Sequence, residues 1–79
     1  MGEVTAPRWL QRGDVVTVTT ARPRAWVIAE VSAVAGCALL VRTYSTGAVH
    51  REWFRLGTVV PAPADHPDRP ALLEALWAS

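Results

Sequence analysis

The sequence predicts a small all-β domain in which five strands form a small barrel and a short C-terminal helix follows. Runs rich in β-branched and aromatic residues recur along most of the chain, and turn-forming glycines and prolines separate them. Near the C-terminus a proline-rich stretch leads into a segment whose leucines have helical spacing. We therefore divide the chain into a barrel with an N-terminal lead-in (residues 1–61), a linker (62–70) and a helical segment (71–79).

Size and composition limit what this chain can be. Its 79 residues are enough for one domain only. A hydrophobic content of 51% with 19% charged residues is typical of a globular protein rather than a disordered one. The single cysteine, Cys37, excludes an intramolecular disulfide and any zinc site built from several cysteines. A reducing compartment fits this usage, so we expect a cytoplasmic protein.

A buried soluble helix and a membrane span are the alternative interpretations of the apolar stretch from Ala25 to Val41. Its 17 residues reach the lower limit for a transmembrane helix. Glu30 near its middle would cost about 2.5 to 3.5 kcal/mol on insertion. Gly36 and the β-branched residues around it favour two strands instead, and we expect no contact with a membrane.

The N-terminal half is predicted to hold two strands. Met1 to Leu10 is a lead-in, in which Trp9 and Leu10 should pack onto the barrel. After a turn at Gly13 the first strand is predicted over Val15 to Thr20, and a proline-containing connection leads to the second, Trp26 to Ser32. Alternation then puts Trp26 and Ile28 on one side of the second strand, and Val27, Ala29 and Val31 on the other.

The clearest hairpin runs from Cys37 to Leu56 around Ser45-Thr46-Gly47. A loop of two or four residues would set Arg42 opposite Arg51 and Leu40 opposite Trp53. The core face would then carry Cys37, Leu39, Val41, Thr43, His50, Glu52, Phe54 and Leu56. A three-residue loop would instead bury Trp53 and Val49 beside Arg51 and Arg55. Because burying unpaired guanidinium groups is costly, we prefer the first register.

The C-terminal third is predicted to add a short fifth strand and a helix. The strand covers Gly57 to Val60 and stops at Pro61, and four prolines in the ten residues from Pro61 to Pro70 indicate an extended linker. A helix should cover Arg69 to Ala78. Its apolar stripe consists of Leu72, Leu73, Leu76 and Trp77. So short a helix is unstable alone, so it must dock on its own barrel or on a partner.

The order of these elements resembles an SH3-like small barrel of the KOW and Tudor type. The resemblance rests on strand order and turn placement: Gly13–Val16 leading into the first strand, Trp26–Val31, Leu39–Arg42 paired through Gly47, and a closing Leu56–Pro61. It implies a protein that binds nucleic acid, peptides or modified side chains. The chain departs from the family's pattern in having no clear aromatic cage, which argues against the recognition of methylated lysine.

Catalytic and metal chemistry find little support. Cys37, His50 and Glu52 share the preferred core face and are the one set that combines a nucleophile, a base and a carboxylate. Facing strands of a small barrel are normally packed, so we interpret His50 and Glu52 as a structural pair near the rim. A second group lies on the linker, where convergent ligands are not expected: Asp65, His66 and Asp68. We therefore expect no enzyme activity, no cofactor and no metal.

Arginine and aromatic residues form the candidate binding surface. Arginine makes bidentate contacts to phosphate and aromatic rings stack on bases. The set consists of Arg42, Tyr44, Arg51, Trp53 and Arg55 on the hairpin, joined by Arg22 and Arg24 from the preceding loop. From residue 8 to 55, seven arginines against three acidic residues give a net charge of +4, whereas residues 56–79 carry −2.

Two functions follow from these surfaces. The first is a small non-catalytic module for protein–protein interaction, a regulatory adaptor or inhibitor, which could be a homo-oligomer. Its partner-binding surface would be the helix stripe of Leu72, Leu73, Leu76 and Trp77. The second is a barrel that binds DNA or RNA through the arginine and aromatic face.

Overall fold

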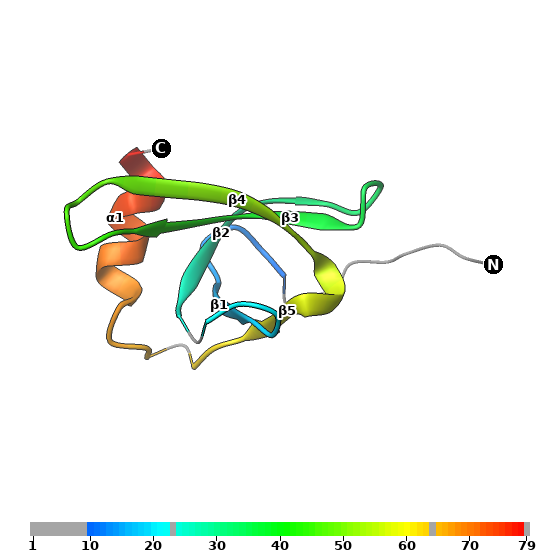
Figure 1. The fold of residues 1–79 in the computed structure, drawn as a ribbon, viewed down its shortest axis with the longest axis horizontal. Coiled ribbons are helices and arrows are strands. Elements are labelled where there is room, and N and C mark those ends of the chain that lie inside the picture. The colour runs from blue at the N-terminus through cyan, green and yellow to red at the C-terminus, as the bar shows by residue number, and fades with distance from the viewer. Residues whose placement is uncertain (1–9, 23, 64, 79) are drawn as a thin grey trace.

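The computed structural model describes residues 10–22, 24–63 and 65–78. Five antiparallel strands form one sheet in the order β4-β3-β2-β1-β5, and a helix follows (Figure 1). The elements are β1 Val15–Val18, β2 Trp26–Ser32, β3 Cys37–Thr43, β4 Val49–Arg55, the 3-10 helix η1 Leu56–Thr58, β5 Val59–Pro61 and α1 Arg69–Ala78. The mostly-β prediction is confirmed, and α1 and the second strand have the predicted bounds.

The sheet bends around a first hydrophobic core on its inner face. Figure 1 shows β1 and β5 curving beneath β3 and β4. The alternate residues of β1 and β2 and two residues of β3 point into this space, as period-two side-chain alternation requires. We call this cluster the inner core: Leu10, Val16, Val18, Trp26, Ile28, Ala38, Leu40, Leu56 and Val59. Leu10 packs as predicted, whereas Trp9 lies outside the described residues.

A second hydrophobic core fills the space between the outer face of the sheet and α1. Leu72 and Leu76 lie on one face of the helix and are 4% and 1% exposed. They pack with side chains of β2 and β3, and the cluster is called the outer core: Val15, Ala25, Val27, Ala29, Val41, Leu72, Ala75 and Leu76. Of the two predicted ways for α1 to dock, the structure has the one on its own sheet.

The register between β3 and β4 differs by one residue from the preferred prediction. Arg42 pairs with His50 and Leu39 with Trp53, so the predicted pairing of Arg42 with Arg51 is wrong. The cause is a three-residue loop. Gly47 N–H donates to the Tyr44 carbonyl and Tyr44 N–H to the Ala48 carbonyl, both at 2.9 Å, and Gly47 has φ +88°. A type I turn followed by a left-handed glycine produces this register.

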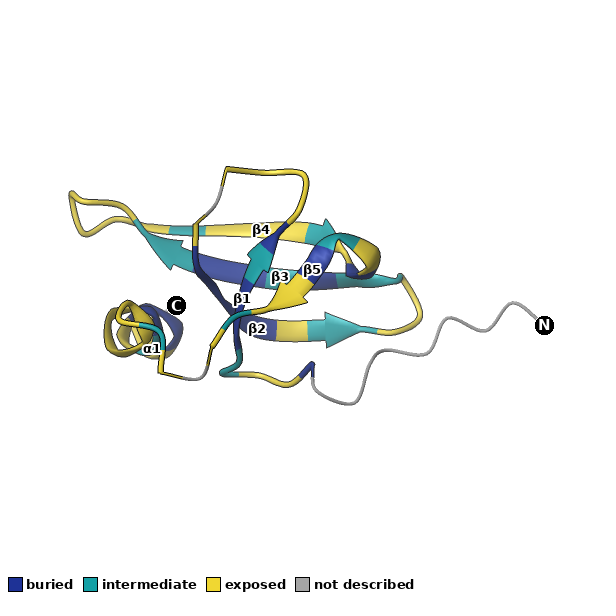
Figure 2. Cartoon of the chain, turned by 90° about the horizontal axis from the view of Figure 1, so that it is seen from below, coloured by how far each residue is buried: buried dark blue, intermediate teal, exposed yellow. Residues whose placement is uncertain are grey.

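In this register the guanidinium groups of Arg51 and Arg55 are not buried, because α1 stops short of β4. The energetic cost that argued against the register therefore does not arise. The helix packs on β2 and β3, and β4 lies at the edge of the sheet with most of its residues exposed (Figure 2). Arg51, Trp53 and Arg55 therefore share a face without being buried. The predicted core face is split in two. Its His50, Glu52 and Phe54 lie on the inner face, and its Cys37, Leu39, Val41 and Thr43 on the outer face.

A β-bulge in β2 changes a second predicted face. Ile28 pairs with Leu40, but Glu30 pairs with the next residue, Leu39, so Ala29 is an extra residue opposite β3. Val31 therefore returns to the inner core instead of sharing the outer side with Val27, as alternation had predicted. The carbonyl of Ala29 accepts a hydrogen bond from Arg12 Nη1 at 3.3 Å.

Two strand boundaries also differ. β1 ends at Val18 rather than Thr20. The predicted fifth strand begins two residues later, because residues 56–58 form η1, where Thr58 Oγ1 donates to the Arg55 carbonyl at 2.7 Å. β5 runs through Pro61, which is tolerated because β5 is an edge strand.

The described residues contain no helix that is both long and apolar enough to cross a membrane. The apolar stretch from Ala25 to Val41 forms most of β2 and β3 with the turn between them.

Candidate functional site

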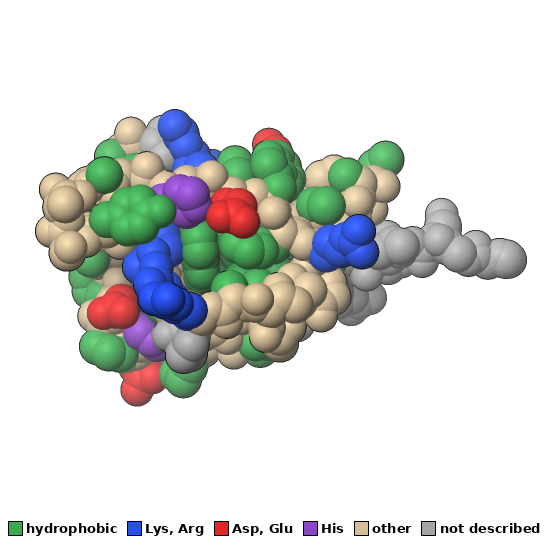
Figure 3. All heavy atoms as spheres, in the orientation of Figure 1, with side chains coloured by type: hydrophobic (Ala, Val, Ile, Leu, Met, Phe, Trp, Pro, Cys, Tyr) green, Lys and Arg blue, Asp and Glu red, His purple; other side chains and the backbone are tan. Residues whose placement is uncertain are grey.

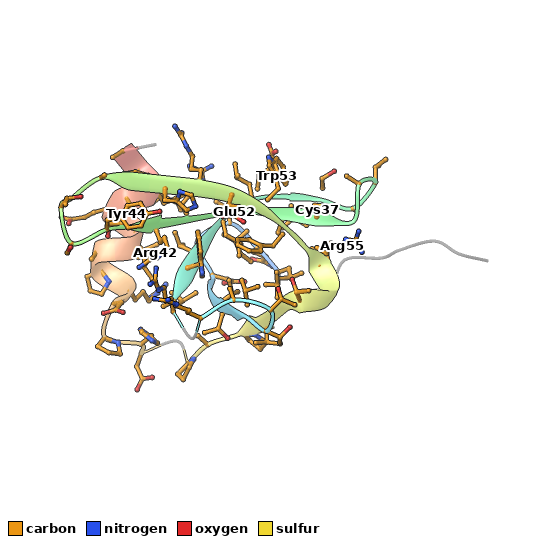
Figure 4. All side chains as sticks on the ribbon, viewed as in Figure 1. Cys37, Arg42, Tyr44, Glu52, Trp53 and Arg55 are labelled. Atoms are coloured by element: carbon orange, nitrogen blue, oxygen red, sulfur yellow. The ribbon has the colours of Figure 1, made fainter. Side chains whose placement is uncertain are left out.

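The register divides the predicted arginine and aromatic surface between the two faces of the hairpin. Arg42 lies on the inner side of β3, and Tyr44 follows it at the end of the strand (Figure 4). The remaining three residues, Arg51, Trp53 and Arg55, lie on the outer face of β4 and are called the outer strip. In Figure 4, Trp53 and Glu52 lie on opposite sides of β4. The sequence prediction of a single surface is therefore wrong.

Arg42 is held between two aromatic rings. Its Cζ lies 5.5 Å from the ring centroid of Trp26 and 5.2 Å from that of Tyr44, within cation–π range. Trp26 is only 5% exposed and belongs to the inner core, whereas Tyr44 is 43% exposed. The guanidinium group is thus oriented from below by a buried ring and reaches solvent beside an accessible one.

His50 extends this cluster along β4. Its ring centroid lies 5.7 Å from that of Trp26 and 5.5 Å from that of Tyr44. His50 Nε2 is 3.0 Å from Glu52 Oε1, which confirms the predicted pair. The buried Nε1 of Trp26 has no hydrogen-bond partner among the described residues.

Cys37 does not join this pair. It lies opposite Arg55 on the other face of the hairpin, and its thiol contacts the Ala35 carbonyl at 3.5 Å. The expectation that Cys37, His50 and Glu52 share one face is therefore wrong. These three side chains do not converge on one substrate position, as nucleophilic catalysis would require.

A surface pocket of about 400 Å³ lies beside Arg42, where the end of the hairpin meets the start of α1. Figure 3 shows arginine side chains crossing this part of the surface near a histidine and acidic side chains. We call it the hairpin–helix pocket, and it is lined by Arg24, Ala25, Arg42, Thr43, Tyr44, Ser45, His66, Asp68, Ala71 and Leu72. Two arginines and three residues with hydroxyl groups, one of them the exposed Tyr44, therefore surround one hollow.

The linker contributes more to this pocket than the sequence indicated. Asp68 N–H donates to His66 Nδ1 at 3.1 Å, so a neutral His66 carries its proton on Nε2. Arg69 N–H and Leu72 N–H donate to the carbonyls of His66 and Asp68. The N–H of Ala71, between them, has no backbone acceptor among the described residues that precede the helix. Ala71 also lines the pocket, so the first turn of α1 brings an amide without a described acceptor to its wall.

The sequence placed His66 and Asp68 on a solvated linker because no local pattern reports where α1 docks. The described residues hold no group of three histidine, cysteine or acidic side chains that could bind a metal ion. Arg24 reaches the pocket, whereas Arg22, predicted to accompany it, is exposed in the turn after β1 and does not line it.

Most of the predicted partner-binding stripe of α1 is buried against the protein's own sheet. Leu72 and Leu76 belong to the outer core, and Leu73 is partly buried against it. Trp77 is 71% exposed, with the guanidinium group of Arg12 5.7 Å from its ring centroid. A partner would therefore meet Trp77 without the leucines.

The predicted arginine and aromatic residues thus form two groups, one around the hairpin–helix pocket and one on the outer strip, and Arg12 with Trp77 forms a third. Comparisons with protein-family models, with curated proteins and with solved structures found no match to this chain.

Proposed function

We propose that the protein is a non-catalytic binding module whose ligand is single-stranded nucleic acid. The observation that carries this proposal is the position of Arg42 between Trp26 and Tyr44, beside the pocket that Arg24 also lines. Guanidinium groups bind phosphate through paired hydrogen bonds, and an exposed tyrosine ring offers a surface on which a base can stack.

A single strand suits this surface better than a duplex does. The bases of a duplex are stacked on one another, whereas those of a single strand are free to stack on Tyr44. The net charge of the chain is only +1, so long-range attraction to a polyanion is weak. Affinity would therefore depend on the local arginines at the pocket.

Burial of the helix stripe is the reason to place nucleic acid ahead of a helix-bound protein partner. Freeing Leu72 and Leu76 for a partner would expose Val27 and Val41, which α1 covers.

The fold also supports the proposal. We propose that the sheet is an SH3-like small barrel, because β5 pairs back onto β1 and five strands surround the inner core.

The test is a titration of the full chain with short single-stranded RNA and DNA and with duplex DNA, followed by tryptophan fluorescence. Two phosphate contacts predict a slope of log K against log salt of about −1.4 for a single strand, or roughly sevenfold weaker binding at about 200 mM than at about 50 mM salt. Arg42→Gln should reduce the slope by about 0.7.

Arg51→Gln is the matched control, because Arg51 has the same charge on the opposite face of the hairpin. It should leave both affinity and slope nearly unchanged. Binding that is absent at both salt concentrations would refute the proposed function. Binding that is lost in Arg51→Gln and kept in Arg42→Gln would refute the proposed site.

A second candidate function is the binding of a protein strand along β4. Among the described strands β4 pairs with β3 alone. The hydrogen bonds at Tyr44–Ala48 and Leu56–Gly36 bracket the ladder, so alternation turns the backbone groups of Val49, Arg51, Trp53 and Arg55 away from β3. Trp53 is 48% exposed there. Such an edge can accept a further strand.

Sedimentation velocity over a range of protein concentrations tests the version of this function in which the added strand comes from a second copy. Arg51→Pro removes an outward-facing amide while sparing the bonds to β3, and it should abolish self-association. Arg51→Gln keeps that amide and should associate as the parent chain does. A protein that stays monomeric at every concentration would rule out this version.

A further inference from the structure

The hairpin–helix pocket has the chemistry to hold one particular part of a nucleic acid. Building on the proposed function, we propose that it binds a terminal phosphate group, a phosphomonoester, of the single strand. The pocket would thereby select strands that end in phosphate over strands that end in a hydroxyl group.

The hydrogen-bond donors at the pocket match a phosphomonoester better than an internal phosphodiester. A phosphomonoester carries a charge of about −1.5 to −2 at neutral pH and three terminal oxygens, whereas a diester has one charge and two such oxygens. The residues that line the pocket carry these donors: the guanidinium groups of Arg24 and Arg42, the hydroxyl groups of Thr43, Tyr44 and Ser45, and the amide of Ala71, which has no acceptor among the described residues. Two cationic groups and several neutral donors fit the more highly charged group.

The opposing charge at the pocket is Asp68. Its carboxylate lines the same hollow and repels an anion, so the two arginines must outweigh it. The first turn of α1 contributes in the favourable direction, because a helix N-terminus carries partial positive charge. With the proton of neutral His66 on Nε2, that ring adds a further donor group to the pocket wall.

The size and the position of the pocket agree with a chain end. About 400 Å³ lies at the lower end of the range for small-molecule sites and suits one nucleotide rather than several. Tyr44 also lines the pocket, so a base next to a bound phosphate has an exposed ring on which to stack.

The experiment compares strands of one sequence that carry a 5′-phosphate, a 3′-phosphate or hydroxyl groups at both ends. Binding to the full chain is measured by fluorescence anisotropy of a dye placed at an internal position. We expect one phosphorylated end to bind at least about tenfold more tightly than the hydroxyl strand. The 5′ and 3′ arms decide which end supplies the phosphate.

Variants assign that difference to the pocket. Arg24→Gln should bring the phosphorylated strand close to the affinity of the hydroxyl strand, and so should Arg42→Lys, which keeps the charge but loses the planar fork. Arg51→Gln should keep the full difference. Because Arg24 is exposed and has no hydrogen bond or ion pair with the described residues, we expect Arg24→Gln to fold as the parent chain does.

The possible results distinguish binding of a terminal phosphate from binding of the single strand itself. Equal affinity for phosphorylated and hydroxyl strands would overturn the terminal-phosphate inference and leave strand binding intact. An absence of binding to all strands would overturn the proposed function and this inference with it. A difference that survives Arg24→Gln and Arg42→Lys would place the phosphate elsewhere and overturn the assignment to this pocket.

Discussion

The two faces of the β3–β4 hairpin carry similar residues and use them differently. On the inner face Arg42 packs between Trp26 and Tyr44, and His50 bonds to Glu52. On the outer strip the arginines and Trp53 are exposed and form no ion pair or cation–π contact with described residues. Composition alone does not make a site, because a neighbouring core must orient the side chains first.

The largest effect on stability is expected in β3, whose two faces pack against the inner and the outer core. Leu40 is fully buried in the inner core, so Leu40→Ala should lower the free energy of unfolding by about 2 to 5 kcal/mol. Leu39→Ala, at the next residue on the opposite face, should cost clearly less because Leu39 is only half-buried. Urea denaturation measures both, and Leu40→Val gives the same ranking if the alanine variant does not fold. An equal loss in both would contradict the observed register.

The next largest loss of stability is expected in the turn that sets the β3–β4 register. Gly47 has φ +88°, where a side chain is strained, so Gly47→Ala should destabilise the protein by about 1 to 2 kcal/mol. Gly57→Ala is the control, because Gly57 is not at positive φ and has open space around its Cα. Thermal unfolding should separate the two variants. The same melting temperature for both would mean that the loop can form without a left-handed residue.

Arg42 and Arg51 test the comparison between the faces directly. Arg42→Gln should lose about 1 kcal/mol of stability, since two cation–π contacts disappear. Arg51→Gln should change the free energy of unfolding by less than about 0.5 kcal/mol. Chemical denaturation of both variants decides this, and a larger loss for Arg51 would show that the outer strip is the organised face.

The smallest effect belongs to the His50–Glu52 pair. Both side chains are partly exposed, so Glu52→Gln should cost less than about 1 kcal/mol. Glu30→Gln provides the comparison, because Glu30 is exposed and has no ion pair among the described residues. Denaturation at low and high salt should show a salt-dependent loss for Glu52 alone. Equal behaviour of the two variants would mean that the pair adds nothing to stability.

Much of the fold could be predicted from local patterns, because each element reports its own period. The bounds of α1 and β2 followed from leucine spacing and from the bounding turns. The β3–β4 register did not follow, because one glycine fits loops of two, three or four residues. The choice between these loop lengths depended on whether Arg51 and Arg55 would be buried. That burial depends on where α1 ends relative to β4.

The candidate site was predicted only in part for the same reason. Arg24, Arg42 and Tyr44 were among the predicted residues and do line one pocket. His66 joins them only because α1 folds back onto the sheet, which brings the linker beside Arg42–Ser45 of the hairpin, more than 20 residues earlier in the sequence. No periodicity within the linker carries that information.

The bulge at Ala29 acts as a one-residue frameshift within the sheet. With an uninterrupted ladder Ala29 would pair with Leu39, and Glu30 would then stand opposite Ala38, facing the inner core. The extra residue turns the carboxylate to solvent and puts Val31 in its place. Deleting Ala29, by contrast, would leave Glu30 opposite Leu39 and Val31 opposite Ala38 in a regular ladder, so both side chains would keep their faces. The bulge thus lets a strand with one extra residue keep its valine inside and its carboxylate outside.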